Sequence, residues 1–345
     1  MSDSICIAVD AMGGDFGPRV VIPASVDALK RHPRLTLQLV GQQEVLTPLL
    51  SQALAKSSDK TLSSRISTIN AEKVIGCDER PSYALRKRRD TSMYRAIMQV
   101  AEGQAQACVS AGNTGALMAL GRFTLKMLPG IDRPAIITAI PSVDGVSYML
   151  DLGANVDCSA EHLLQFAIMG SVMTSAVEGI AAPRVGLLNV GAEEIKGNEQ
   201  VKLASRLIRE HGGLNYHGFI EGGDIFTGKV DVVVCDGFVG NIALKSSEGV
   251  ARLIGQQLKR SFSRSLRRKL MAWLAKPVLE EIRAHIDPAR RNGASLLGLQ
   301  GIVVKSHGSA NRECFGYAID QAVAEVIMDV PGSINRQLES HITDS

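Results

Sequence analysis

The chain has 345 residues, of which 45% are hydrophobic and 21% are charged, as in an ordinary globular protein. Aromatic residues make up only 4% whereas glycine occurs 33 times, which favours aliphatic strands joined by tight glycine turns over an aromatic-packed β-sandwich. The formal net charge of +3 is too small to indicate nucleic acid, so we expect no nucleic-acid partner. No stretch approaches the roughly 20 apolar residues that a membrane-spanning helix needs.

The six cysteines are spaced singly, without a C-x-x-C pair or a zinc-type spacing. The amino terminus lacks the basic and apolar regions of a secretory signal, so reduced thiols in a cytoplasmic protein are expected. The sequence also lacks the G-x-x-x-x-G-K-[ST] loop, the G-x-S-x-G elbow and H-E-x-x-H. These absences disfavour nucleotide hydrolysis and serine acyl-enzyme chemistry, and we expect neither a metal nor another cofactor.

Short apolar runs alternate with helical patterns along most of the chain. Strands are expected, in chain order, at 5–9, 35–40, 107–109, 135–140, 147–150, 185–190, 230–234 and 302–304. Helices are expected at 18–30, 46–54, 114–127, 160–179, 197–211, 240–258 and 309–328. This alternation predicts an α/β fold with a mostly parallel sheet covered on both faces, in one catalytic unit that spans 1–345.

Residues 255–292 break the alternation and carry all the basic excess of the chain. They contain ten lysines and arginines and three acidic residues, a net charge of +7, which leaves −4 for the rest. On a helical wheel one narrow face of this segment is apolar and the opposite face is basic. The apolar face holds Phe262, Leu266, Leu270, Trp273 and Leu274, and the basic face holds Arg260, Arg264, Arg267 and Arg268. Pro277 interrupts the pattern before an apolar stripe resumes, so we expect a protruding basic amphipathic helical hairpin.

Turns rich in glycine, asparagine and aspartate follow several of the expected strands. In a doubly wound sheet such turns gather along the carboxyl edge, where these folds bind ligands. The first turn, residues 10–18, contains Asp10, Gly13 and Gly14, and its backbone amides and the following helix N-terminus suit an anion. A plain strand-to-helix turn explains it as well.

The second turn opens a helix and combines hydroxyls, glycines and an amide. Its members are Ser110, Gly112, Asn113, Thr114 and Gly115. They form either an oxyanion or phosphate cradle or a simple N-cap. A third turn at 151–157 admits the same two interpretations.

The next turns carry cations. Residues 189–199 place Lys196 and Asn198 at a strand-to-helix junction, although a surface lysine is usually only solvated. Residues 236–241 contain Asp236, Gly240 and Asn241, and the helix that follows places Lys245 on the same face as Asn241. A last turn contains His307, which would be structural in most proteins but here follows a strand on the expected ligand edge.

Together these motifs resemble bacterial phosphate acyltransferase, the PlsX family of phospholipid synthesis. The similar stretches are IAVDAMGGDFGP at 7–18, CVSAGNTGALMAL at 108–120, GIDRPA at 130–135, LDLGANVDC at 150–158, QFAIMG at 165–170, LLNVGAEEIKGNE at 187–199, DVVVCDGFVGNIALKSSEG at 231–249, LLGLQG at 296–301 and KSHGSAN at 305–311. They span nearly the whole chain in the family's order. Small departures occur at Thr91, Ser295 and Ala310.

The resemblance implies a three-layer α/β/α sandwich like that of phosphotransacetylases and isocitrate or isopropylmalate dehydrogenases, and a homodimer. It implies acyl-acyl carrier protein and inorganic phosphate as substrates. The acyl phosphate product would pass to a membrane glycerol-3-phosphate acyltransferase. Catalytic roles carry over to Lys196 in E-x-K-G-N and to Asn241 in D-G-F-x-G-N.

The chemistry of the implied reaction fits these motifs. Phosphate is an adequate nucleophile near neutral pH and a thiol is a tolerable leaving group, so no strong general base or acid is required. The reaction needs phosphate held in line with the thioester and donors aimed at the developing oxyanion. Lys196 would neutralise phosphate, while Asn241 and backbone amides near Asn113 or Gly240 would bind phosphate or oxyanion, in a direct transfer without a covalent intermediate.

The basic hairpin has three interpretations. Its charge would attract an acidic carrier protein, or it would bind an anionic membrane surface and make the protein peripherally membrane-associated. The candidate contacts for either role are Arg264, Arg267, Arg268, Leu270 and Trp273. Alternatively, the apolar stripe packs on a dimer partner.

Three other functions compete with this one. A phosphate acetyltransferase would use acyl-coenzyme A in place of the carrier protein. A dehydrogenase of the isocitrate type would need metal-binding aspartates and a nicotinamide. A membrane-recruited scaffold would bind lipid-synthesis enzymes without turnover.

Overall fold

The computed structural model describes residues 4–143, 145–286 and 292–343, and its core is one sheet of eleven strands. The strand order is β3-β2-β1-β4-β11-β10-β5-β6-β9-β7-β8. The strands are β1 (Ile5–Asp10), β2 (Leu35–Gly41), β3 (Ile66–Asn70), β4 (Ala107–Ser110), β5 (Ala135–Ser142), β6 (Gly145–Leu150), β7 (Val185–Leu188), β8 (Tyr216–Ile220), β9 (Val232–Val234), β10 (Ala294–Leu297) and β11 (Ile302–Lys305). All the strands expected from the sequence are present, and β3, β8 and β10 are additional.

The sheet is mostly parallel, as expected, but its two halves run in opposite directions. Strand β10 is antiparallel to both β11 and β5, and β5 is antiparallel to β6. All other neighbouring strands are parallel. Strands β1 to β4 and β11 therefore point one way, whereas β6 to β9 point the other way.

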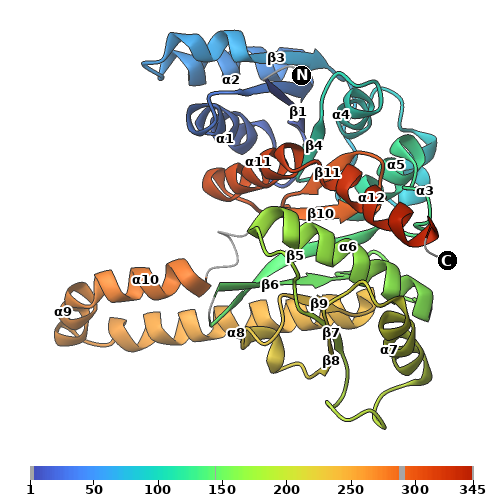
Figure 1. Cartoon of the computed structure of the whole chain (residues 1–345). Helices are drawn as coiled ribbons and strands as arrows, with labels where there is room; N and C mark the ends of the chain where they lie inside the picture. The colour runs from blue at the N-terminus through green and yellow to red at the C-terminus, as the bar shows by residue number, and fades with distance from the viewer. Residues whose placement is uncertain (1–3, 144, 287–291, 344–345) are drawn as a thin grey trace.

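Helices cover both faces and give the three-layer α/β/α sandwich that the sequence predicts (Figure 1). On the first face lie α1 (Pro18–Arg31), α2 (Gln43–Ala55), α6 (Ala160–Glu178), α7 (Glu199–His211), α11 (Arg312–Ile327) and α12 (Val330–Thr343). On the second face lie α3 (Pro81–Arg86), α4 (Ser92–Ala101), α5 (Thr114–Leu125) and the start of α8 (Gly237–Ser263). Two short 3-10 helices, Lys60–Arg65 and Asp224–Phe226, complete the body.

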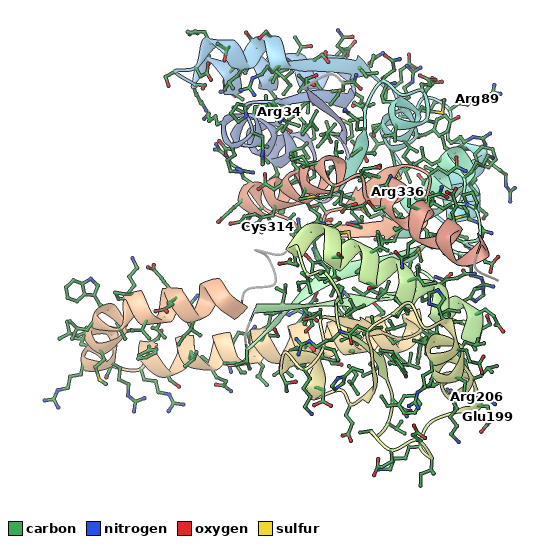
Figure 2. All side chains as sticks on the ribbon, viewed as in Figure 1. Arg34, Arg89, Glu199, Arg206, Cys314 and Arg336 are labelled. Atoms are coloured by element: carbon green, nitrogen blue, oxygen red, sulfur yellow. The ribbon has the colours of Figure 1, made fainter. Side chains whose placement is uncertain are left out.

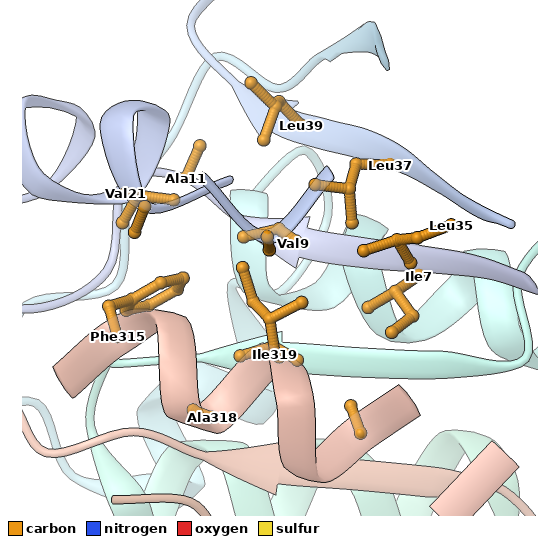
Figure 3. Close-up of a cluster of buried hydrophobic side chains, with 14 of the residues drawn as sticks. Ile7, Val9, Ala11, Val21, Leu35, Leu37, Leu39, Phe315, Ala318 and Ile319 are labelled. Atoms are coloured by element: carbon orange, nitrogen blue, oxygen red, sulfur yellow. The ribbon is translucent and has the colours of Figure 1, made fainter. Parts of the chain in front are cut away.

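Alternation along the strands sends successive side chains to opposite faces. In β1, Ile7 and Val9 join the core beneath α1 and α11, where Figure 3 shows them facing Phe315 and Ile319 of α11. Ala8, between them, belongs to the core on the second face. The strands are apolar on both faces because both faces are buried.

The segment that the sequence predicts as a hairpin is an arm that projects from the body (Figure 1). It consists of the outer part of α8, then α9 (Leu266–Leu274) and α10 (Lys276–Ile286). A helix of 27 residues is about 40 Å long, so α8 reaches far beyond the sheet. Part of the predicted hairpin, residues 287–291, lies outside the described residues.

One detail of the expected hairpin is wrong. The helical wheel treats residues 260–274 as one helix, but α8 ends at Ser263 and α9 starts at Leu266, where the hydroxyl of Ser265 caps the new helix. Phe262 therefore lies on a different helix from Leu270 and Trp273. No helix among the described residues is both long and apolar enough to cross a membrane.

Candidate functional site

The polar turns form two groups because the halves of the sheet point in opposite directions. Strands β1, β4 and β11 end at one edge, so the turns that begin at Asp10, Ser110 and Ser306 lie together there; we name them the first turn group. Strands β6, β7 and β9 run the other way and end with the turns 151–157, 189–199 and 236–241, the second turn group. The sheet therefore has no single carboxyl edge, contrary to expectation, yet both groups leave it near the same row, because Val304 of β11 is level with Leu150 of β6 through β10 and β5.

Direct hydrogen bonds join the turns of the first group. The Ser110 hydroxyl donates to Oδ2 of Asp10 (2.7 Å) and accepts from the amide of Gly112 (3.0 Å). The amide of Ser306 donates to the Ser110 carbonyl (2.9 Å). The amide of Asp15 donates to the Gly308 carbonyl (2.9 Å). These bonds fix the ends of three strands relative to one another.

Two glycines allow this close approach. A Cβ on Gly13 would lie 2.6 Å from Oδ2 of Asp10 and 2.7 Å from the amide nitrogen of Gly112. Gly14 has a φ of +87°, and a Cβ there would lie 3.0 Å from the Gly308 carbonyl oxygen. Both glycines are therefore required for packing turn against turn, whatever they bind.

The first turn group contains buried groups that titrate. Asp10 is 1% exposed, and burial raises its pKa. Lys305, the last residue of β11, is 9% exposed, and burial lowers its pKa to about 8. Sequence reasoning missed Lys305, because a lysine that ends an apolar strand is normally solvated.

His307 adds a neutral donor to this group. Its Nδ1 accepts a hydrogen bond from the amide of Ser309 (3.2 Å), so the neutral ring carries its proton on Nε2. Partial burial lowers the pKa of His307, and the positive charges of Lys245 and Lys305 lower it further. The ring is therefore neutral at pH 7.

Helix α8 connects the two turn groups. Lys245 pairs with Glu248 (3.6 Å), and both charges act on His307 in the first group. One turn earlier, Asn241 lies beside Gly153 in the second group, where a Cβ on Gly153 would be 3.5 Å from Cβ of Asn241. Asn241 and Lys245, which the sequence places on one face of the helix, thus lie near different turn groups.

The start of α8 packs tightly on the turn after β6. Asp151 is fully buried and accepts hydrogen bonds from the amides of Ile136 (2.9 Å) and Asn155 (2.6 Å). A Cβ on Gly240 would lie 1.9 Å from the Asp151 carbonyl oxygen. The amide of Gly240 itself donates to the carbonyl of Asp236 within the helix (2.9 Å), so binding of a ligand by backbone amides near Gly240 would fall to its neighbours.

Lys196 lies on the turn after β7. Its side chain folds over Gly191, and Nζ pairs with Glu193 (2.8 Å) while 46% of the side chain remains exposed. This ion pair raises the pKa of Lys196, which therefore stays a cation. Lys196 and Asn241 follow neighbouring strands, because β7 pairs with β9.

Several predicted site residues act as helix caps. Asn113, Asn198 and Asp236 accept hydrogen bonds from backbone amides at the starts of α5, α7 and α8. The amide group of Asn113 also donates to the carbonyls of Cys77 (2.7 Å) and Glu79 (2.9 Å). These contacts support the capping interpretation of Asn113 and occupy its side chain.

The remaining predicted residues differ in environment. Thr114 is exposed, whereas Gly115 packs on α3, since a Cβ there would lie 2.9 Å from Cγ of Pro81. In the described ranges, no group of three or more His, Cys, Asp or Glu side chains could hold a metal ion. Leu270 and Trp273 on the arm are 58% and 69% exposed. Figure 2 shows the side chains of α9 extending away from the body.

Comparisons with known proteins find relatives over nearly the whole chain. A family model described as fatty acid synthesis protein matches residues 5–332. A relative from Halorhodospira halophila named phosphate acyltransferase is 54% identical and covers 98% of this chain and 97% of its own length. One of the same name from Alkalilimnicola ehrlichii is 56% identical and covers 99% and 98%.

Solved structures confirm the expected resemblance in fold. A phosphotransacetylase from Streptococcus pyogenes has a TM-score of 0.64 at 19% identity and covers 95% of both chains. The EutD phosphotransacetylase from Staphylococcus aureus has a TM-score of 0.62 at 17% identity and covers 94% of both chains. At this level of identity the likeness concerns the fold alone.

Proposed function

Since the chain belongs to the family described as fatty acid synthesis proteins, in which its relatives are named phosphate acyltransferases, we propose that it makes acyl phosphate for phospholipid synthesis. The acyl donor is acyl-acyl carrier protein and the acceptor is inorganic phosphate. A phosphate oxygen bonds to the thioester carbon, the carbon–sulfur bond breaks, and the carrier-protein sulfur leaves and takes a proton. The products are acyl phosphate and free carrier protein.

The first turn group beside α8 is the observation that supports this proposal most. It brings the start of α1, the cations Lys245 and Lys305 and the neutral donor His307 to one place. A helix N-terminus and cations favour an anion such as phosphate, and their positions are fixed before substrate arrives. The site needs no general base to activate the acceptor, because phosphate is already nucleophilic near neutral pH.

Lys196 and Asn241 stabilise the transition state in this proposal. Lys196 carries a positive charge, and its side chain is half exposed next to the start of α7. Asn241 is exposed on the first turns of α8 and can donate to an oxyanion. Acyl transfer is direct in this proposal, since the ion pair with Glu193 keeps Lys196 protonated and therefore not nucleophilic, and the amide of Asn241 is not a nucleophile.

The deciding experiment compares two acyl donors. We expect the purified protein to release thiol from acyl-acyl carrier protein only when phosphate is present, and to form an acyl phosphate that hydroxylamine traps. A chelator should leave the rate unchanged. Release from acyl-coenzyme A but not from the carrier protein would favour a phosphate acetyltransferase instead, and an acylated side chain would overturn direct transfer.

We further propose that the arm binds an anionic membrane surface, where the glycerol-3-phosphate acyltransferase consumes the product. The arm combines exposed Leu270 and Trp273 with Arg264, Arg267 and Arg268. Basic side chains and exposed apolar ones together suit the lipid headgroup region. The protein is then a peripherally associated homodimer, and docking of the acidic carrier protein is the competing use of the same arm.

A further inference from the structure

Three buried polar residues lie side by side at the ends of three adjacent strands. Asp10, Ser110 and Lys305 are register partners on the adjacent strands β1, β4 and β11. Two positions earlier the corresponding row is apolar and belongs to the core of the second face; it consists of Ala8, Cys108 and Val303. Side chains two positions apart share a face, so the polar row points toward the layer that contains α8.

Lys305 is the cation of this row. Its Nζ donates to the carbonyl of Ala111 (3.3 Å) and to that of Ser306. An ammonium group has three protons, so one donor remains for a ligand. Among the described residues no carboxylate forms an ion pair with Lys305, although only 9% of the residue is exposed.

The titratable groups around Lys305 do not neutralise it at contact distance. Burial disfavours its ammonium form, Cys77, Asp10 and Asp15 favour it from further away, and Lys245 on α8 disfavours it. The carboxylate of Asp10 is already held by the Ser110 hydroxyl. A buried cation without a partner in contact is costly, and such groups cluster at functional sites.

We propose that Lys305 is a catalytic residue that binds the phosphate nucleophile in the first turn group. This proposal rests on the phosphate acyltransferase function above and adds a residue and a place for the acceptor. Phosphate would supply the missing anion and lie between Lys305 and Lys245, within reach of the glycine-rich turns. The competing explanation is that the ammonium only clamps the two carbonyls.

The two explanations predict different dependence on pH. Burial lowers the pKa of Lys305 to about 8, so the free site loses its positive charge as pH rises through this value. Above this pH the affinity for an anion should fall by up to tenfold per pH unit. If the ammonium only clamps the two carbonyls, the affinity should not follow its deprotonation. Sulfate keeps both charges over this range, unlike phosphate, and is therefore the better probe. His307, whose pKa is lowered from 6.5, stays neutral throughout.

The experiment measures sulfate and phosphate binding to the full-length protein by calorimetry, between about pH 7 and pH 9. Lys305→Met should weaken both anions by about 10- to 100-fold, the effect of losing one charged hydrogen bond, and should remove the pH dependence. Lys305→Arg should still bind sulfate, with an affinity that does not change over this pH range. Lys60→Met, an exposed lysine near the β3 edge of the sheet, is the matched control and should behave as wild type.

Steady-state kinetics provide the second measurement. The KM for phosphate should rise in Lys305→Met while the KM for the acyl donor changes little. The proposal is overturned if Lys305→Met binds sulfate as tightly as Lys60→Met does. It is also overturned if the sulfate affinity of the wild type does not change with pH. If Lys305→Met does not fold, the wild-type profile and Lys305→Arg decide. If wild type binds sulfate as expected yet makes no acyl phosphate, the acyltransferase function fails and the anion site stands.

Discussion

Gly240 should be the position on α8 that least tolerates a side chain. A Cβ there would lie 1.9 Å from the carbonyl oxygen of Asp151 and 2.9 Å from Sγ of Cys235. Real Cβ contacts are essentially never shorter than 3.0 Å, so in Gly240→Ala the helix must retreat from the β6 turn by about 1.1 Å, the difference between 3.0 and 1.9 Å. Backbone lies on both sides of this contact, and neither side can rotate away.

The displacement should affect both stability and turnover. Overpacking of this kind costs about 1–3 kcal/mol in the free energy of unfolding. The same shift would move Asn241 and Lys245, and a misplacement of about 1 Å can lower the rate about 10²-fold. Urea unfolding followed by circular dichroism measures the first effect, and kcat/KM with acyl-acyl carrier protein measures the second.

Gly249→Ala is the control because it makes the same chemical change on the same helix. A Cβ on Gly249 meets no atom within 4 Å, and alanine favours a helix over glycine by about 1 kcal/mol. This variant should therefore be slightly more stable than wild type and fully active. If Gly240→Ala unfolds and turns over like Gly249→Ala, α8 does not approach the β6 turn as closely as described.

Three further predictions concern other parts of the molecule. Lys196→Ala and Asn241→Ala should each lower kcat/KM by roughly 10²–10³ without unfolding the protein, as expected for the loss of one donor in the transition state; near wild-type turnover would remove that residue from the mechanism. Replacing both Leu270 and Trp273 with serine should abolish sedimentation with anionic vesicles, and salt should weaken sedimentation of wild type, because each basic residue near the surface contributes about 1 kcal/mol; a variant that still sediments would indicate protein packing instead. Burial raises the pKa of Glu325 from 4.5 to about 7, so the carboxyl group loses its proton at a lower pH in the unfolded chain than in the folded one. The free energy of unfolding of the wild type should therefore fall by roughly 3 kcal/mol as pH rises through this window. The stability of Glu325→Gln relative to wild type should then be greater at about pH 8 than at about pH 5. If urea unfolding gives the same difference in stability at both pH values, this prediction is wrong.

Helix starts were predictable because their caps are local in sequence. Asn113 and Asn198 stand directly before α5 and α7, and their side chains accept from amides three residues on. The same locality explains why Asn113 also resembled a ligand donor. A cap and an anion cradle use the same residue types, and only the contacts of Asn113 with the carbonyls after Gly76 separate the two.

Strand direction was not predictable, because an apolar run is the same pattern whichever way its strand points. The net reversal lies between β5 and β6, because β10 is antiparallel to both β11 and β5 and leaves these two pointing the same way. Strand β10 itself was missed because its four residues, Ala294–Leu297, are too few to show a period. Strand β3 was missed for a related reason, since Ser67, Thr68 and Asn70 make it polar. With the direction unknown, the turns could be identified but not assigned to their two groups.

The order of strands also has a consequence for how the chain is made. Strands β10 and β11 lie between β4 and β5 in the sheet but follow β9 in the chain. Until they emerge from the ribosome, β4 and β5 each present an open edge to other nascent chains. From Val234 at the end of β9 to Ala294 at the start of β10 is an interval of 60 residues, which takes about 3–12 s at 5–20 residues per second. The arm occupies most of this interval, so slow codons placed within it should increase aggregation during synthesis, whereas the same codons placed after β11 should not.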